Sequence, residues 1–184
     1  MPTAKLKPPP QSQISPAGRE FLTQWEGGAH TKAYRDQAGK LTIGAGHCLT
    51  PDELATGLVR IKGQMIPWKK GLSVLQMDLL LDQDMDVAEY AICRLVTVPL
   101  TVDQFDALTM LVFNIGAGRG GFSTSTLLTI LNAKDYAGVP AQFKRWNKTR
   151  IDGVKQVSRG LINRRAKEIW LWNGGTGPLP TPVK

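Results

Sequence analysis

Glu26, Asp36 and Thr42 place two carboxyl groups and one hydroxyl group within a stretch of 17 residues. Glu26 ends an apolar helical segment beside Trp25, where partial burial and the negative end of the helix dipole disfavour an ionised carboxylate. Asp36 lies in a polar turn, where an ionised carboxylate costs little. Cleavage of a glycosidic bond needs such a pair, one carboxyl group to donate a proton and another to attack or to activate water. The two residues can therefore divide the acid and base roles.

Glu26 and Asp36 also have an ordinary structural interpretation. A glutamate at a helix end and an aspartate in a turn are solvated or capping residues in most proteins. The pair alone therefore does not distinguish an active site from two surface carboxylates.

The segments around these residues resemble those of the phage-type lysozymes, glycoside hydrolase family 24. The resemblance extends over nearly the whole expected folded body. It rests on Glu26-Gly27, Ala33-Tyr34-Arg35-Asp36, Gly39, Thr42–His47, Phe113–Gly116, Phe122–Leu128 and Gly160–Ala166.

This resemblance implies that Glu26 is the general acid, while Asp36 and Thr42 hold the attacking water on the opposite face of the sugar. A threonine hydroxyl suits that position because it can both accept a hydrogen bond from water and donate one to it. Nine residues separate Glu26 from Asp36, one more than is usual in the family. We place the extra residue in a turn over Gly27–His30, with His30 as a loop residue.

Five further residues near the expected site each have two interpretations. By resemblance, Phe113 lines the cleft and stacks on sugar, although a core phenylalanine gives the same pattern. The resemblance also implies that Ser125 hydrogen-bonds the glycan, although it can instead cap a helix. The resemblance implies further that His47 is structural rather than catalytic and pairs with an acidic side chain across its lobe. Gly44 and Gly46 indicate a β-turn rather than a phosphate-binding loop, because no βαβ pattern surrounds them.

The elements expected to position these residues form an α+β, lysozyme-like fold. It is mainly helical, with a small antiparallel sheet, a long connecting helix, a helical C-terminal lobe and a cleft between the lobes. The only region predicted to be β is 33–49, where apolar and polar residues alternate between glycines. Helices are expected from Ser15 to the Gly27-Gly28 pair, then over 73–95, 101–113, 125–132, 139–146 and 158–172.

The chain divides into a flexible arm over 1–14, one catalytic domain over 15–173 and a flexible tail over 174–184. Within the domain we expect a small lobe over about 15–70, the connecting helix over about 73–95 and the helical lobe over about 96–173. We expect a monomer.

The net charge of +8 and a pI near 9.7 favour a polyanionic partner, but they do not distinguish nucleic acid, an acidic membrane and the bacterial envelope. No nucleic-acid-binding motif is recognisable, so no nucleic-acid partner is expected. The two cysteines and two histidines lack metal-site spacing, and no metal or other cofactor is expected. The basic residues Arg159, Arg164, Arg165 and Lys167 cluster on the last helix. We interpret them as a solvated face, with the alternative that, given the net charge of +8, they add to a surface that docks on an anionic wall.

The N-terminus lacks the apolar stretch of a secretory signal, and no later window is long and apolar enough to span a bilayer. We expect the chain to stay in the host cytoplasm until a holin-type membrane partner permeabilises the inner membrane. It would then act on the glycan strands of peptidoglycan in the periplasm and release the phage.

Three other functions remain open. The chain can be a wall-binding or nucleic-acid-binding module without activity. It can be a lysozyme that acts when a phage penetrates its host. It can also be a lytic transglycosylase, which cleaves the same bond without hydrolytic water, although the Asp36 and Thr42 pair favours hydrolysis.

Overall fold

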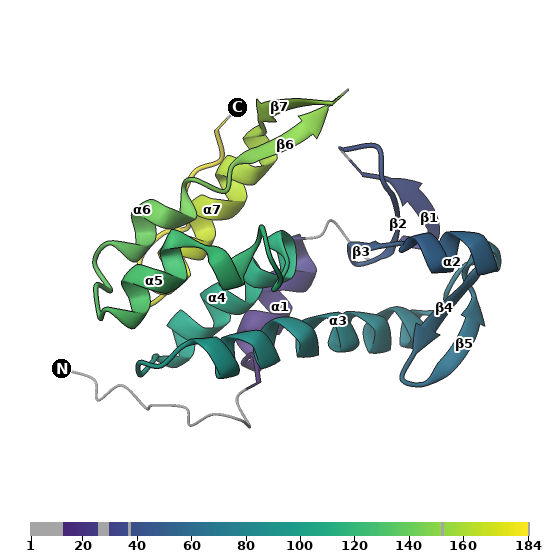
Figure 1. Ribbon diagram of the computed structural model, residues 1–184, viewed down its shortest axis with the longest axis horizontal. Helices are drawn as coiled ribbons and strands as arrows, with labels where there is room; N and C mark the ends of the chain where they lie inside the picture. Colours follow the sequence, from purple (N-terminus) through teal and green to yellow (C-terminus); the bar gives the residue numbers. More distant parts are fainter. Residues whose placement is uncertain (1–12, 26–29, 37, 152, 184) are drawn as a thin grey trace.

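The computed structural model describes residues 13–25, 30–36, 38–151 and 153–183, without the side chains of residues 23–25 and 151 (Figure 1). The described helices are α1 (Pro16–Trp25), α2 (Pro51–Thr56), η1 (Trp68–Lys70), α3 (Val74–Leu95), α4 (Val102–Ile115), η2 (Phe122–Thr124), α5 (Thr126–Asn132), α6 (Val139–Phe143) and α7 (Arg159–Trp172). The described strands are β1 (His30–Arg35), β2 (Leu41–Gly44), β3 (His47–Cys48), β4 (Leu58–Ile61), β5 (Gln64–Pro67), β6 (Lys148–Ile151) and β7 (Val154–Val157).

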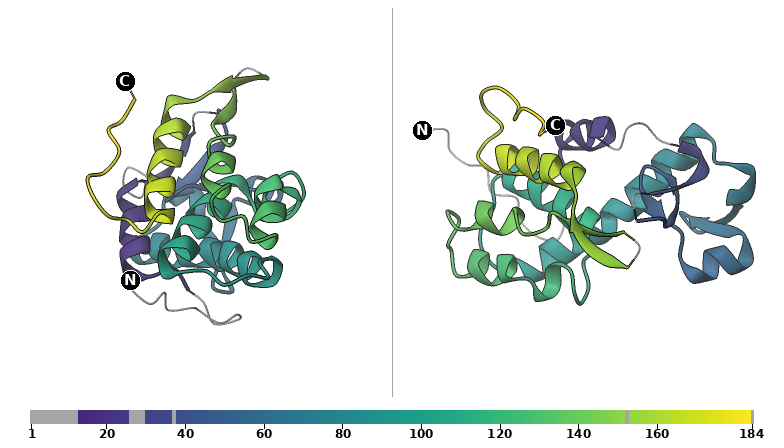
Figure 2. Two further views of the ribbon diagram at one scale, coloured as in Figure 1. Left: turned by 90° about the vertical axis from the view of Figure 1, so that its left-hand side faces the viewer. Right: turned by 90° about the horizontal axis from the view of Figure 1, so that it is seen from above.

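Helix α3 connects two lobes (Figures 1 and 2). The small lobe contains the antiparallel sheet β1–β2–β3, helix α2 and the hairpin β4–β5, and the helical lobe contains α4 to α7 and the hairpin β6–β7. Ser73 begins α3 because its side chain accepts a hydrogen bond from the Gln76 amide, and the Gln76 side chain accepts one from the Ser73 amide. The predicted α+β architecture and the helix over 73–95 are confirmed.

Each lobe has its own apolar core, and a third cluster joins them. Ile43, Val59 and Leu80 are fully buried in the small lobe, whereas the core of the helical lobe is larger and centres on α4. The junction cluster takes side chains from α1, the β2–β3 turn, α3 and α4. It consists of Leu22, Ala45, Leu81, Met85 and Met110.

Helix α1 packs against the helical lobe, although the sequence interpretation placed it in the small lobe. The side chain and amide of Ser15 hydrogen-bond to the buried carboxylate of Asp106 on α4. Arg19 forms an ion pair with Asp82 on α3, with 2.7 Å between Nη2 and Oδ1. These partners lie 91 and 63 residues away, so local sequence patterns carry no signal for them.

The prediction that 33–49 is the only β region is wrong, because two further hairpins are present. Lys62 and Gly63 connect β4 to β5, and both have positive φ, as a tight two-residue turn requires. Asp152-Gly153 stands between β6 and β7, and Gly153 has φ of +79°. An Asp-Gly pair is a strong hairpin signal, so this turn was predictable from the sequence.

The C-terminal segment is held in place rather than being the flexible tail expected over 174–184. The Val183 amide donates a 2.7 Å hydrogen bond to the Asn163 side chain, and the Asn163 amide group donates one to the Val183 carbonyl at 3.3 Å. The segment therefore folds back beside α7 (Figure 2). Of the arm expected over 1–14, residues 1–12 lie outside the described residues, and the Ile14 amide donates a hydrogen bond to buried Glu89.

A buried ion cluster joins α7 to α4. Glu168 is 0% exposed and forms ion pairs with Arg164 at 3.2 Å and Arg165 at 2.9 Å. Burial lowers the pKa of Arg165 to about 10 against the opposing attraction of Glu168, so its guanidinium stays charged at neutral pH. Arg165 also donates to the side chain of Asn114, and Arg164 donates to the Met110 carbonyl. The interpretation of both arginines as part of a solvated face is therefore wrong, since Arg164 and Arg165 are 8% and 1% exposed.

Glu168→Gln should lower the free energy of unfolding by about 3 kcal/mol, because it leaves two buried guanidinium groups without their carboxylate. Urea unfolding at neutral pH measures the change. Asp78→Asn, at an exposed position on α3, is the control and should change the free energy of unfolding by less than about 0.5 kcal/mol. An equal effect of the two substitutions would show that the ion cluster contributes nothing.

Candidate active site

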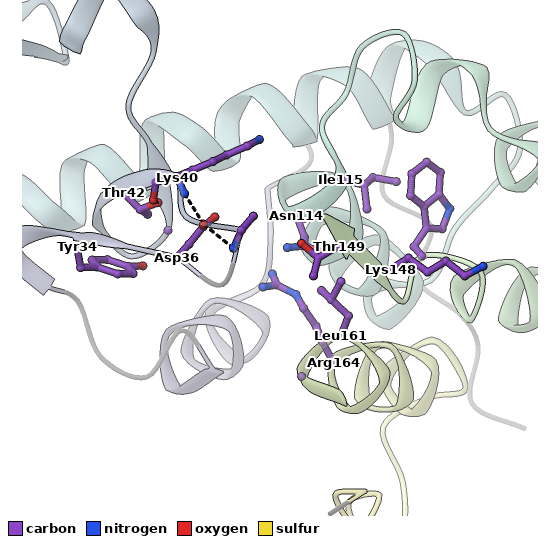
Figure 3. Close-up of a pocket in the computed structure, with 14 residues that line it drawn as sticks. Tyr34, Asp36, Lys40, Thr42, Asn114, Ile115, Lys148, Thr149, Leu161 and Arg164 are labelled. Carbon is purple, nitrogen blue, oxygen red and sulfur yellow. Dashed lines mark hydrogen bonds between the residues drawn. The ribbon is translucent and has the colours of Figure 1, made fainter. Parts of the chain in front are cut away.

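A cavity of about 540 Å³ lies between the lobes and takes side chains from both (Figure 3). The small lobe contributes the end of β1, the β1–β2 turn and β2. The helical lobe contributes α4, the start of β6 and the start of α7. The lining residues are Tyr34, Asp36, Ala38, Lys40, Thr42, Gly46, Asn114, Ile115, Trp146, Lys148, Thr149, Gly160, Leu161 and Arg164.

Asp36 lines this cavity from the turn between β1 and β2. Its Oδ1 accepts hydrogen bonds from the amides of Ala38 at 2.9 Å and Lys40 at 2.8 Å. The Asp36 and Lys40 backbones also pair across the turn at 2.9 Å. Within the described part of the chain, Oδ2 has no hydrogen-bond partner. The turn therefore orients the carboxylate through one oxygen and leaves the other for a ligand in the cavity.

Thr42 lines the same cavity from β2 and is 3% exposed. Its hydroxyl donates a 3.2 Å hydrogen bond to the Lys40 carbonyl, so the oxygen keeps its capacity to accept. The pairing of Tyr34 with Thr42 in the β1–β2 ladder fixes its position. The structure thus brings Asp36 and Thr42 to one cavity.

Glu26 lies outside the described residues, as does the segment 27–29 that was expected to hold the extra residue. The expectation that His30 is a loop residue is wrong, because it begins β1 and its ring lies 4.3 Å from that of Tyr34. His30 pairs with Gly44 and Tyr34 pairs with Thr42, so β1 has two more residues than β2 over this interval. The two additional residues of β1 therefore lie within the long spacing between Glu26 and Asp36.

Gly44 and Gly46 flank Ala45 in the turn between β2 and β3, with φ of +65° and +96°. A side chain at either position would strain this backbone, which explains glycine at both. The turn lies against α3, since a Cβ atom on Gly44 would contact Leu80 and Met77. Gly46 lines the cavity.

His47 lies between two carboxylates that join the sheet to α3 and α2. Its Nδ1 is 2.8 Å from Asp84 on α3, and its Nε2 is 3.1 Å from Glu53 on α2. Burial lowers the pKa of His47, but hydrogen bonds and charge attraction from Asp84 and Glu53 outweigh burial and raise the pKa to about 8. At neutral pH the imidazolium donates to both carboxylates and holds three elements of the small lobe together.

Phe113 lines an adjoining cavity of about 380 Å³ and packs against the junction cluster and the core of the helical lobe. The two cavities share Asp36, Asn114 and Arg164, so they form parts of one cleft. Asn114 and Arg164 were not selected as site residues in the sequence, although both lie inside the family-like motifs. From the sequence alone, no spacing rule distinguishes Asn114 and Arg164 from ordinary helix residues.

Ser125 lines a third cavity, of about 340 Å³, next to the hairpin β6–β7. Its hydroxyl donates to the Phe122 carbonyl at 2.7 Å and accepts from the Leu128 amide at 3.1 Å, which caps α5. The second of these hydrogen bonds makes Ser125 the N-terminal cap of α5. Trp146 lines both this cavity and the first one, so the two cavities adjoin at this residue.

The described residues form neither a metal-binding cluster nor a membrane-spanning helix. No group of three or more His, Cys, Asp or Glu side chains there could hold a metal ion. None of the described helices is long and apolar enough to cross a membrane.

The chain is similar to known proteins over both lobes. Residues 23–168 match the phage lysozyme family. An endolysin from Acyrthosiphon pisum secondary endosymbiont phage 1 is 36% identical over 84% of this chain and 94% of the relative. A SAR-endolysin from Escherichia phage Mu is 39% identical over 76% of this chain and 70% of the relative. The solved structure of an endolysin from Escherichia coli O157:H7 phage FAHEc1 has a TM-score of 0.73 at 30% identity, over 92% of this chain and 98% of that one.

The free energy of unfolding should fall by about 2 kcal/mol between about pH 6 and pH 9 through His47 alone. Its folded-state pKa of about 8 lies above the ordinary value of 6.5, so the stabilisation is fully present below pH 6.5 and is lost as the pH rises through 8. Glu53, whose pKa lies below its ordinary value, titrates on the acid side of this window. Urea unfolding of the wild type and of His47→Asn across the range isolates the effect. A stability difference between the two proteins that stays constant with pH would contradict the assignment.

Proposed function

The chain belongs to the phage lysozyme family, and on that premise we propose that its cleft hydrolyses the β-1,4 bond between N-acetylmuramic acid and N-acetylglucosamine in peptidoglycan through Glu26, Asp36 and Thr42. The family membership makes the chain a peptidoglycan-degrading lysozyme of the endolysin type, with a lysozyme-like fold. The observation that carries the proposed site is the convergence of Asp36 and Thr42 on one cavity between the lobes.

In this mechanism Glu26 donates its proton to the glycosidic oxygen as the bond to the sugar breaks. The free oxygen of Asp36 accepts a hydrogen bond from the attacking water, and the Thr42 hydroxyl accepts a second. Water held in this way loses its proton to Asp36 as it bonds to the anomeric carbon. The two amides that bind Oδ1 of Asp36 support the role, because they fix the carboxylate before substrate arrives.

The remaining contacts with the glycan are proposed on the lining of the cleft. Phe113 stacks on a sugar ring, while Asn114 and Arg164 hydrogen-bond its substituents. Ser125 contacts the glycan from the third cavity through its second lone pair. His47, Gly44 and Gly46 act indirectly, by holding the sheet that carries Thr42. We propose that residues 15–173 form one catalytic domain and act as a monomer, without a metal or other cofactor.

The alternative activity is that of a lytic transglycosylase, which forms an anhydro-sugar within the substrate and uses no water. The two polar groups of Asp36 and Thr42 that line one cavity favour hydrolysis, because intramolecular attack needs no residue to hold water. The products distinguish the two reactions.

Digestion of purified peptidoglycan should release fragments that end in reducing N-acetylmuramic acid, which mass spectrometry identifies by their mass. Glu26→Gln should lower the rate by a factor of about 10³ or more while leaving the fold intact, since the amide keeps the volume and has no acidic proton. Asp36→Asn and Thr42→Ala should each lower kcat more than they change KM.

The exposed substitution Asp78→Asn serves as the matched control and should leave the rate unchanged. Anhydro-muramic products would overturn hydrolysis in favour of transglycosylation. Near-wild-type turnover by a folded Glu26→Gln protein would remove the acid from its role.

We propose further that the enzyme accumulates in the host cytoplasm and reaches the periplasmic wall when a holin-type membrane partner opens the inner membrane. The chain carries 23 basic and 15 acidic residues, and charged side chains cross a hydrocarbon core at high cost. The physical alternative is a segment of the chain that takes the enzyme across by itself.

Expression of the chain alone in a Gram-negative host should leave the culture density unchanged until chloroform permeabilises the inner membrane, after which the density should fall within minutes. The Glu26→Gln variant, treated in the same way, shows how much of the fall is due to catalysis. Spontaneous lysis with active enzyme in the periplasm would establish export without a partner.

A further inference from the structure

The basic charge of the chain is concentrated in one segment. Residues 144–159, which include the hairpin β6–β7, contain six basic residues and one acidic residue, against a net charge of +8 for all 184 residues. Figure 1 shows the hairpin projecting from the helical lobe. Its β7 residues and Lys148 and Arg150 are exposed.

The hairpin register places three of these basic residues on one face. Lys148 and Arg150 are two residues apart on β6, and Lys155 on β7 pairs directly with Arg150. Residues two apart on a strand and residues paired across strands share a face. Lys148, Arg150 and Lys155 therefore form one surface, which we call the cationic face. Thr149 takes the opposite side, as Figure 3 shows for Thr149 and Lys148.

This arrangement is unfavourable for the hairpin itself. Like charges directly opposite one another, as in the Arg150 and Lys155 pair, destabilise a two-stranded ladder. An isolated two-stranded hairpin is marginally stable even without such repulsion. No acidic side chain forms an ion pair with any of the three residues in the described part of the chain. An anionic ligand on the cationic face would relieve the repulsion.

The cationic face adjoins the cleft in which the glycan is cut. Lys148 lines the cavity that contains Asp36 and Thr42, and Lys155 lines the third cavity, with Arg145. Trp146 is common to both cavities, so they lie on either side of it. A polymer held at Asp36 that extends past Trp146 would therefore reach these basic side chains.

We propose that the cationic face of the hairpin β6–β7 binds the free carboxylates of the peptides attached to the glycan strand, an inference that rests on the proposed function. The sugars of the strand offer no charge, because the lactyl carboxyl group of each muramic acid is consumed in the amide bond to its peptide. The negative charge of the substrate near the cleft is therefore on the peptides. Charge complementarity and position assign them to this face, which makes Arg150 and Lys155 determinants of specificity for peptide-bearing strands.

The test compares two substrates and two double variants. One substrate is purified peptidoglycan, and the other is the same material stripped of its peptides by an amidase. The hairpin variant is Arg150→Gln with Lys155→Gln. The control is Arg60→Gln with Lys70→Gln, which removes the same charges from exposed positions on β4 and η1 in the small lobe. Reducing ends released per unit time give kcat/KM for each combination.

In the hairpin variant, the ratio of kcat/KM on peptide-bearing glycan to kcat/KM on stripped glycan should fall about fivefold, as expected for two exposed ion pairs of modest strength. The control variant should keep the wild-type ratio. In the wild type, the ratio should also fall as salt rises, since the pairs are exposed. The melting temperature of the hairpin variant should not decrease, because the substitutions remove a repulsion, and this measurement separates lost binding from lost folding.

An unchanged ratio in the hairpin variant, or a wild-type ratio of one, would overturn the assignment while leaving the proposed hydrolysis in place. A wild type that cleaves neither substrate would instead refute the proposed function and this inference with it. Binding to phosphatidylglycerol vesicles gives the remaining comparison. If the hairpin variant loses vesicle binding and keeps the wild-type ratio, the face docks on lipid and the peptide assignment is wrong.

Discussion

The side of the cleft formed by α4 and α7 depends on the carboxylate of Glu168, which is fully buried. Glu168 neutralises Arg164 and Arg165, and these in turn hold the Met110 carbonyl and the Asn114 side chain of α4. A buried carboxylate with two guanidinium groups is stable only when all three are present, since any unpaired member bears its full desolvation cost. The cluster therefore fixes the spacing of α4 and α7. That spacing sets where Asn114 and Arg164 enter the cleft.

The same lobe also positions the helix that precedes Glu26. Asp106, on α4, is 2% exposed and takes both the amide and the hydroxyl of Ser15, so the start of α1 is tied to the centre of the helical lobe. Leu22, further along α1, packs in the junction cluster with Met85 and Met110. The chain thus begins in the helical lobe, crosses to build the small lobe, and returns through α3.

Local signals in the sequence predicted helices α3 and α4 well, because their starts depend on neighbouring residues. Helix α2 was missed, although Thr50 and Glu53 form a capping box at its start. Ser73 and Thr101 each cap a helix with a glutamine three residues later, and both helices begin where predicted. The hairpin β6–β7 was missed although Asp152-Gly153 marks its turn, because flanking basic residues hide the alternation of a strand. The burial of Arg164 and Arg165 was not predictable locally, since it depends on partners more than 50 residues away. In the site, Asp36 and Thr42, which the motifs singled out, both line one cavity, whereas Asn114 enters the cleft only through tertiary packing.

Each lobe has its own cluster of charged side chains that joins its helices and strands. His47 with Glu53 and Asp84 holds the sheet to α2 and α3, while Glu168 holds α7 to α4. Apolar contacts of the junction cluster and the length of α3 carry the connection between the lobes. Deprotonation of His47 therefore weakens the attachment of the sheet that contains Thr42 to α2 and α3. It does not weaken the ion cluster between α4 and α7 that includes Arg164. The proposed activation of water and the proposed binding of the glycan thus depend on different charges.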